Sequence, residues 1–166
     1  MIITLRGLKE RSEIDNLFSF YSKVLKKTPI PYFSKRIYNS LYATEDIRVA
    51  EEDSNIVGSI TVFRRFMYWN NKILPYAGIG NVATLPEKQG LGIATEVMKD
   101  ALDYLFKLSL NISILFTGIN SFYKKFSFIA INTFQATFYI QDINIKDYSI
   151  RNFNMDNLES VSIIYE

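Results

Sequence analysis

The first forty residues carry the apolar spacing of one short strand followed by two amphipathic helices. Residues 2–5 are predicted to form the strand. The next apolar residues fall on one face of a helix (Ile14, Leu17, Phe18, Tyr21 and Val24). The sequence Ser12-Glu13-Ile14-Asp15 resembles a capping box that opens this helix, and Pro29 lies just beyond its predicted end. A second helix is predicted over residues 32–42.

From residue 47 onward the apolar positions change to the spacing of strands. Ile47 and Val49 indicate one strand, and the run 56–63 indicates a second, with a turn at residues 53–55 between them. Asn70-Asn71 forms a second predicted turn. Residues 76–85 then predict a third strand, which Pro86 ends because proline cannot donate to a strand ladder. Three strands joined by tight turns favour an antiparallel meander.

The second half of the chain returns to alternating helices and strands. A strong amphipathic pattern predicts a helix from Ile93 to Phe106, and residues 112–116 resemble a fully buried strand. A short helix over 121–126 and strands over 128–131 and 133–140 complete the pattern. The whole order predicts a mixed α/β, α+β-like domain with a central, mostly antiparallel twisted sheet that helices flank.

The end of the chain repeats the order of its beginning. The segment 149–165 follows the scheme of residues 4–21, in which a strand and an arginine precede Asp-Asn-Leu at the start of a helix. Either a second copy of the domain begins here or the match arose by chance in an asparagine-rich chain. The predicted organisation is therefore one domain over residues 1–145 and a strand–helix segment over 146–166.

Composition narrows the possible chemistry. The chain has 166 residues, enough for one domain, and 48% of them are hydrophobic. It has no Cys and no His, which excludes thiolate nucleophiles, Cys-ligated metals, Ser-His-Asp triads and imidazole bases. A net charge of +2 and the lack of a long apolar run give no case for nucleic acid or a membrane as partner. A cytoplasmic protein without a bound metal is expected.

Residues 63–69 combine two arginines with four aromatic side chains. Such a run is compatible with stacking on single-stranded nucleic acid, or with a long, bent strand at a sheet edge whose charges face water. The small net charge and the missing RNP1 pattern favour the strand.

The segment from Gly80 to Thr95 is the strongest candidate for a binding site. It consists of a predicted strand, a proline, a turn with Gly90 and Gly92, and the start of a long helix. Glycines let successive backbone amides converge, and the helix N-terminus adds free N–H groups and a positive dipole end. A phosphate or pyrophosphate suits this arrangement. The alternative is a plain strand-to-helix turn, and the pattern is neither a Walker loop nor the dinucleotide fingerprint.

The order of the motifs gives this segment its specificity. The run Gln89-Gly90-Leu91-Gly92-Ile93-Ala94 resembles the Arg/Gln-x-x-Gly-x-Gly/Ala signature of the GCN5-related N-acetyltransferases (GNAT). Residues 122–128 are similar to the family's Phe-Tyr-x-Lys-x-Gly-Phe segment, and the element order over residues 1–142 also agrees. Residues 78–86 resemble the first domain of the enhanced-intracellular-survival type, which carries two GNAT-like domains in tandem.

This resemblance implies a GNAT-like fold that uses acetyl-CoA as co-substrate and no metal. Backbone groups of Val82, Ala83 and Thr84 would pair with the pantetheine arm, and an amide near Val82–Ala83 would polarise the thioester carbonyl. The pyrophosphate would lie among the amides of the following loop and helix start (Gln89, Gly90, Leu91, Gly92, Ile93, Ala94 and Thr95). The implied reaction is direct transfer of the acetyl group to an amine.

The sequence offers one candidate for the general acid of this reaction but several for the general base. Tyr123 is the candidate general acid, since a phenol is a neutral proton donor at pH 7. Candidates for the base are Glu51, Glu52, Asp46 or a chain of waters. In the resembling subgroup the base is the carboxyl terminus of a much longer chain, so that assignment cannot be carried over. Ser127 stands where the family has glycine, at a cost of about 1 kcal/mol if a positive φ is needed.

The function expected from sequence is an N-acetyltransferase for a primary amine, which could be a small molecule or a protein. The alternative is a non-catalytic acyl-CoA-binding or structural module whose partner domain completes the site. The missing base and Ser127 favour the module, whereas the two motifs favour the enzyme. A homo-oligomer or a second GNAT-like domain is a possible partner in either case.

Overall fold

The computed structural model describes residues 2–26 and 43–131. The predicted helix over 32–42, the predicted strand over 133–140 and the segment 146–166 lie outside the described residues. The chain divides into two compact units, Met1–Ile119 and Asn120–Glu166, and each is described by itself.

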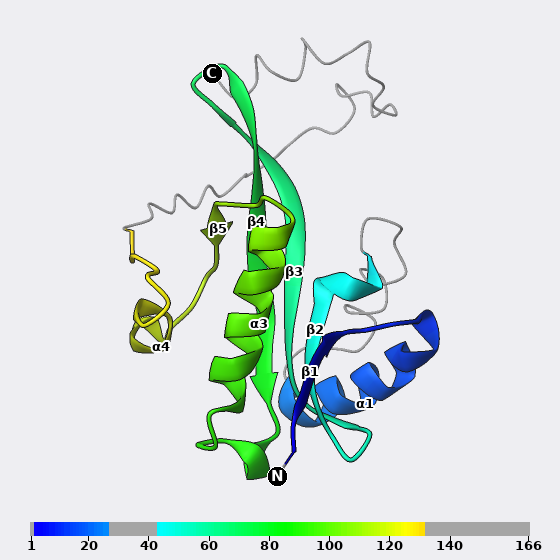
Figure 1. The fold of residues 1–166 in the computed structure, drawn as a ribbon. Helices are drawn as coiled ribbons and strands as arrows, with labels where there is room; N and C mark the ends of the chain where they lie inside the picture. The colour runs from blue at the N-terminus through cyan, green and yellow to red at the C-terminus, as the bar shows by residue number, and fades with distance from the viewer. Residues whose placement is uncertain (1, 27–42, 132–166) are drawn as a thin grey trace, which may run out of the picture. The chain divides into compact units, whose positions relative to one another are not determined.

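The first unit is built on a five-stranded sheet (Figure 1). The strands stand in sequence order, and the first four pair antiparallel while the fifth is parallel to the fourth. They are β1 (Thr4–Gly7), β2 (Ile47–Glu52), β3 (Asn55–Trp69), β4 (Lys72–Thr84) and β5 (Ser113–Ile114). The predicted antiparallel meander and the mixed, mostly antiparallel fold are confirmed.

Two tight turns fix the meander. Asp53 and Ser54 join β2 to β3 with φ of 48° and 65°, and Asn70 and Asn71 join β3 to β4 with φ of 48° and 59°. Two-residue loops with positive φ match the natural twist of a hairpin, and Asn and Asp tolerate that conformation best. The second hairpin is longer than predicted, and it projects beyond the rest of the sheet (Figure 1).

Residues 63–69, with their arginines and aromatic rings, form the outer half of β3. Among the described residues they pair with β4 alone, since β2 reaches only as far as Thr61. The predicted edge strand is therefore confirmed. Arg64 differs from the expectation that the charges face water, because its guanidinium forms an ion pair with the buried Asp46.

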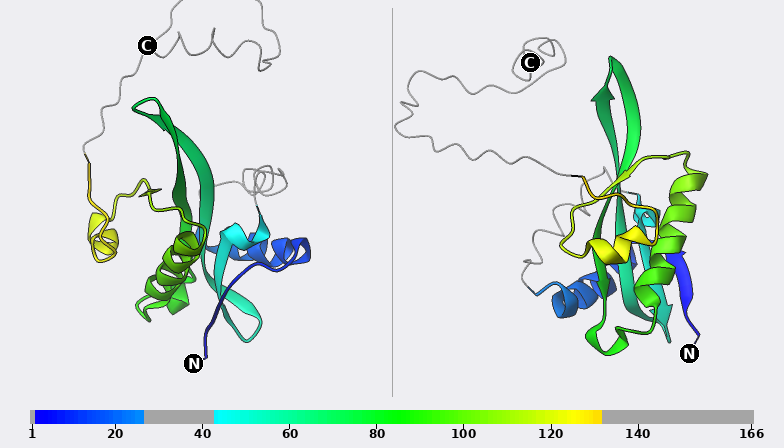
Figure 2. Two further views of the ribbon diagram at one scale, coloured as in Figure 1. Left: turned by 45° about the horizontal axis from the view of Figure 1, so that its top comes forward. Right: turned by 90° about the vertical axis from the view of Figure 1, so that its left-hand side faces the viewer.

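Helices α1 (Ile14–Val24) and α3 (Ile93–Lys107) cover opposite faces of the sheet (Figure 2). Adjacent residues of β3 make these contacts: Ser59 lies against Tyr21 of α1, while a Cβ added to Gly58 would lie 2.8 Å from Ile93 of α3. Successive side chains of a strand point to opposite faces, so the helices must lie on opposite sides. The side chains between these layers form the core (Ile14, Leu17, Tyr21, Val49, Ile60, Val62, Val97, Met98, Ala101 and Leu105).

The start of α1 differs from the predicted capping box. A short 3₁₀ turn, Arg11–Glu13, precedes the helix, and the Glu13 carboxylate accepts hydrogen bonds from the backbone N–H groups of Lys9 (2.6 Å) and Glu10 (3.4 Å). Ser12 instead donates to the side chain of Glu10 (3.1 Å). The longer carboxylate reaches back to two amides at once, which a serine hydroxyl cannot do.

Two strand predictions in the second half were wrong. The strand over 112–116 forms only at Ser113–Ile114, and Ile112 and Phe116 are 39% and 91% exposed rather than buried. The cause is its edge position, because within the described ranges β5 pairs only with β4. Residues 128–131 form no strand. The short helix predicted over 121–126 is present as α4 (Asn120–Lys124).

Candidate functional site

The carboxyl half of β4 carries a bulge. Ser59 pairs with Ala83 and Thr61 pairs with Gly80, so Asn81 and Val82 together face the single residue Ile60. Asn81 takes up the extra length with φ 50°, a left-handed conformation that asparagine tolerates. A bulge bends its strand and redirects the backbone groups beside it.

Beyond this bulge, one edge of β4 is open. The contact with β5 is limited to the pairs Ala77–Ser113 and Gly78–Ile114. From Ile79 to Thr84, therefore, β4 has β3 on one side and no strand among the described residues on the other. The sequence-predicted residues Val82, Ala83 and Thr84 lie at this open edge, where an extended ligand could add itself as a strand does.

The loop after β4 contains two left-handed glycines. A 3₁₀ turn at Pro86–Lys88 leads to Gly90 with φ 78° and to Gly92, the N-cap of α3, with φ 82°. A Cβ added at either glycine would meet nothing within 4 Å. Both glycines are therefore needed for their backbone angles and not for lack of space.

Five successive amides of this loop point away from any partner in the described part of the chain. The N–H groups of Gln89 and Thr95 donate to the carbonyls of Pro86 (3.2 Å) and Gly92 (2.9 Å). Those of residues 90–94 have no acceptor within residues 2–26 and 43–131. Residues 90–92 are also exposed. The free amides and the positive end of the α3 dipole make this loop suited to an anion.

The first turn of α3 is anchored directly beneath this loop. Ile93 is buried against β3 at Gly58, the residue that pairs with Thr84 at the end of β4. The absence of a side chain at Gly58 thus lets the helix N-terminus and the open edge of β4 lie side by side. The Thr84 hydroxyl is buried here without a hydrogen-bond partner among the described residues, and such groups usually have one.

The three carboxylates considered as bases are all ion-paired. Asp46 accepts from Arg64 Nε (2.8 Å) and the Tyr104 hydroxyl (3.0 Å), and burial together with the charge of Asp46 raises the pKa of Tyr104. Glu51 binds Arg6 through Nε (3.0 Å), and Glu52 forms a salt bridge with Lys88. These contacts give each carboxylate a structural role between elements.

A polar cluster under the bulge was missed from sequence. The hydroxyls of Tyr21, Ser59 and Thr61 are buried, with 0%, 1% and 3% of these residues exposed. Tyr21 Oη lies 3.2 Å from Thr61 Oγ1 and 3.3 Å from Ser59 Oγ. Asn81 joins them, because its Nδ2 donates to Thr61 Oγ1 (3.1 Å) and its carbonyl accepts from Ser59 (3.3 Å). These four residues are the hydroxyl cluster. An asparagine inside a strand pattern was its one sequence signal.

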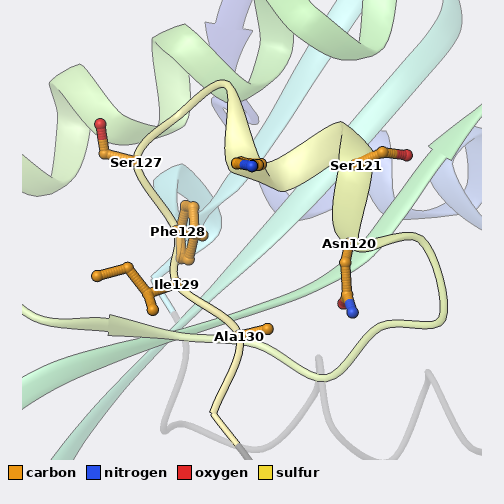
Figure 3. Close-up of a pocket in the computed structure, with 7 residues that line it drawn as sticks. Asn120, Ser121, Ser127, Phe128, Ile129 and Ala130 are labelled. Carbon is orange, nitrogen blue, oxygen red and sulfur yellow. The ribbon is translucent and has the colours of Figure 1, made fainter.

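Tyr123 belongs to the second unit, in helix α4. Its ring contacts Phe122 edge to face, with centroids 4.9 Å apart, and Phe128 with centroids 6.1 Å apart. Ser127 follows with φ 66°, the positive value that glycine would adopt more easily. The helix and this turn line a cavity of about 560 Å³ (Figure 3; Asn120, Ser121, Lys124, Ser127, Phe128, Ile129 and Ala130).

Two searches for other kinds of site gave nothing in the described residues. No three Asp, Glu, His or Cys side chains of residues 2–26 and 43–131 gather where they could hold a metal ion. None of the described helices combines the length and the apolar character that a membrane crossing requires.

Solved structures with similar folds include two acetyltransferases and Eis1. An acetyltransferase from Trypanosoma brucei matches with a TM-score of 0.63 and 18% identity, over 83% of this chain and 100% of that one. Glucosamine-6-phosphate N-acetyltransferase from Arabidopsis thaliana matches with a TM-score of 0.62 and 18% identity, over 85% and 100%. Eis1 from Mycobacterium abscessus matches with 0.63 and 16%, over 75% of this chain but only 30% of its own.

Family assignment rests on the sequence. A search of the curated proteins found no match. The family model described as "Acetyltransferase (GNAT) domain" matches residues 4–130, which include the bulge, the glycine loop and α4. Because this match spans well over half of the chain, the protein belongs to the GNAT family of acetyltransferases.

Proposed function

We propose that this protein transfers the acetyl group of acetyl-CoA to a primary amine by direct attack of the amine on the thioester. The observation that carries the proposal is two neighbouring groups of backbone atoms without a partner among the described residues. The open edge of β4 at Val82–Thr84 leads into five free amides at residues 90–94. These groups match a linear ligand with an amide-containing arm and a diphosphate.

Each part of acetyl-CoA has a complementary group in this proposal. The amides of residues 90–94 hold the pyrophosphate with the dipole of α3, and the edge of β4 pairs with pantetheine. The Val82 amide then donates to the thioester oxygen and stabilises the negative charge that develops there during attack. Binding amine and thioester in line supplies much of the rate enhancement.

The proposed reaction breaks one bond and forms another. The amine nitrogen bonds to the acetyl carbon, the carbon–sulfur bond breaks, and CoA leaves as a thiolate. Tyr123 donates its phenolic proton to that thiolate, and the amine loses a proton to water. Water fits this second step better than Asp46, Glu51 or Glu52, because each of these carboxylates is ion-paired.

A second candidate function is a non-catalytic acyl-CoA-binding module. The same three ion-paired carboxylates favour it, since they leave the amine without an evident base. The partial match to the longer Eis1 suggests that a second GNAT-like domain could complete such a site. In either case we propose a cytoplasmic protein, and for the enzyme we propose a small-molecule or protein amine as the acceptor.

Calorimetry followed by a turnover assay separates these possibilities. We expect CoA and acetyl-CoA to bind, and one or more members of a panel of primary amines to be acetylated. Tyr123→Phe should bind acetyl-CoA normally and lose turnover, while Tyr68→Phe, on the exposed hairpin, should keep it. Binding without turnover on any amine supports the module, and failure to bind either nucleotide at millimolar concentration contradicts both functions.

A further inference from the structure

The hydroxyl cluster under the bulge contacts the peptide group that carries the Val82 amide. The Asn81 carbonyl and the Val82 N–H belong to one planar peptide unit and point in opposite directions across it. Ser59 donates a hydrogen bond to that carbonyl at 3.3 Å. The direction of the Val82 N–H is therefore set by a residue that the sequence analysis did not consider.

From this geometry we infer that Tyr21, Ser59 and Thr61 are positioning residues for acetyl transfer. They hold the Asn81–Val82 peptide so that its N–H points at the thioester carbonyl. The inference rests on the proposed function, because it concerns the same carbonyl. None of the three residues touches acetyl-CoA in this account, and each acts through the backbone of β4.

The cluster is built to hold the bulge in one conformation. Asn81 is fixed twice, through its carbonyl by Ser59 and through its side chain by Thr61. Tyr21 joins both hydroxyls and brings α1 into contact with the bulge. Burial raises the pKa of Tyr21, so its hydroxyl stays protonated and able to donate at neutral pH. Asn81 tolerates its positive φ better than most residues do, and these hydrogen bonds hold it in that one conformation.

The placement also separates two parts of the site. The amides at residues 90–94 belong to the loop and α3, on the far face of the sheet from α1. Loss of a hydroxyl in the cluster should therefore disturb the acetyl end of the ligand and leave the pyrophosphate end in place. A merely structural role would weaken both ends together.

The test compares hydroxyl-deleting variants with a matched control. Ser59→Ala and Thr61→Val remove one hydroxyl with little change in volume, Thr61→Ser keeps it, and Tyr21→Phe provides a third site if one variant misfolds. The control is Tyr104→Phe, whose hydroxyl bonds Asp46 and Arg64 outside the hydroxyl cluster. The readouts are kcat, the affinity for CoA, and the infrared carbonyl band of bound acetyl-CoA labelled with ¹³C in the acetyl group.

We expect Ser59→Ala and Thr61→Val to lower kcat by about tenfold, the equivalent of weakening one oriented donor. Their carbonyl band should move to higher frequency, while CoA affinity stays within about twofold of wild type, in line with an intact anion site. Thr61→Ser and Tyr104→Phe should behave like wild type.

The possible failures are distinct. If the wild-type chain binds acetyl-CoA but the cluster variants leave the carbonyl band unmoved, the inference is wrong and the proposed function stands. A loss of CoA affinity as large as the loss of kcat in the same variants likewise overturns the inference, because that indicates a general structural role. If the wild type binds no CoA, the proposed function fails first and the inference with it. A wild type that binds without turnover still gives the infrared result.

Discussion

At the scale of single residues, Ser127 carries a backbone conformation that its side chain disfavours. Its φ of 66° lies in the left-handed region, where a Cβ costs about 1 kcal/mol or more. We expect Ser127→Gly to raise the free energy of unfolding by about 1 kcal/mol and the melting temperature by about 2–4 °C. Ser121→Gly, inside α4, should instead lose stability. A Ser127→Gly chain that melts at or below the wild-type temperature would contradict this account.

We propose that Gly92 needs its positive φ for binding as well as for folding. It is the N-cap of α3 and stands in the middle of the five free amides. Because alanine resists φ 82°, Gly92→Ala should rotate these amides and weaken CoA binding by about tenfold in calorimetry. Gly118→Ala is the matched control, since its added methyl also meets open space and no positive φ is involved. Equal CoA affinities for the two variants would show that the loop does not contribute to CoA binding.

At the scale of elements, Asp46 joins three of them. It ends the 3₁₀ turn Thr44–Asp46 that precedes β2, accepts from Arg64 of β3 and from Tyr104 of α3, and is itself buried. Asp46→Ala would remove the acceptor shared by Arg64 and Tyr104. Because the Arg64 side chain is 43% exposed, we expect a cost of about 1–3 kcal/mol, below that of a fully buried pair. We expect that loss in denaturant unfolding, with Glu45→Ala, an exposed neighbour, near wild type. Asp46→Asn that keeps its stability and CoA affinity but loses all turnover would instead identify Asp46 as the base.

Arg6 joins β1 to the 3₁₀ turn Arg11–Glu13 through Glu13 and to β2 through Glu51. Burial raises the pKa of Glu13, but hydrogen bonds from Arg6 and from the N–H groups of Lys9 and Glu10 outweigh it, so the pKa falls below its ordinary 4.5. This contribution to stability is complete above pH 4.5 and is lost as pH falls through the lowered value. Glu13→Gln should therefore show a flatter loss of stability in acid than the wild type does.

Local chemistry decided which elements could be predicted from sequence. The turns at Asp53-Ser54 and Asn70-Asn71 and the apolar face of α3 depend on neighbouring residues alone, and all three appear where expected. The capping of α1 depended on side-chain reach, which favoured Glu13 over Ser12. The strand around Ile114 depended on having neighbours on both sides, and no local pattern reports that.

At the scale of the whole molecule, the proposed binding site combines features that the sequence could predict with features that depend on the assembled sheet. The glycine loop was predictable because Gly90 and Gly92 mark themselves in the sequence. The bulge at Asn81 was not, since it arises from the register between β3 and β4 and from hydroxyls forty residues or so apart along the chain. The ion pairs of Asp46, Glu51 and Glu52 also required the assembled sheet. The sequence thus led to the proposed ligand, whereas the fold led to the proposal of how its carbonyl is held.

Binding of CoA to the folded chain alone should raise the stability of the whole molecule by mass action. At 100 times the dissociation constant the gain is about 2.7 kcal/mol, or about 5–10 °C in melting temperature for a chain of this size. Pantetheine, which lacks the pyrophosphate, should give a much smaller shift in melting temperature at the same concentration, because the amides of residues 90–94 then have no phosphate to donate to. Differential scanning fluorimetry measures both. If pantetheine stabilises the chain as strongly as CoA does, the glycine loop contributes nothing to the affinity and the diphosphate must lie elsewhere.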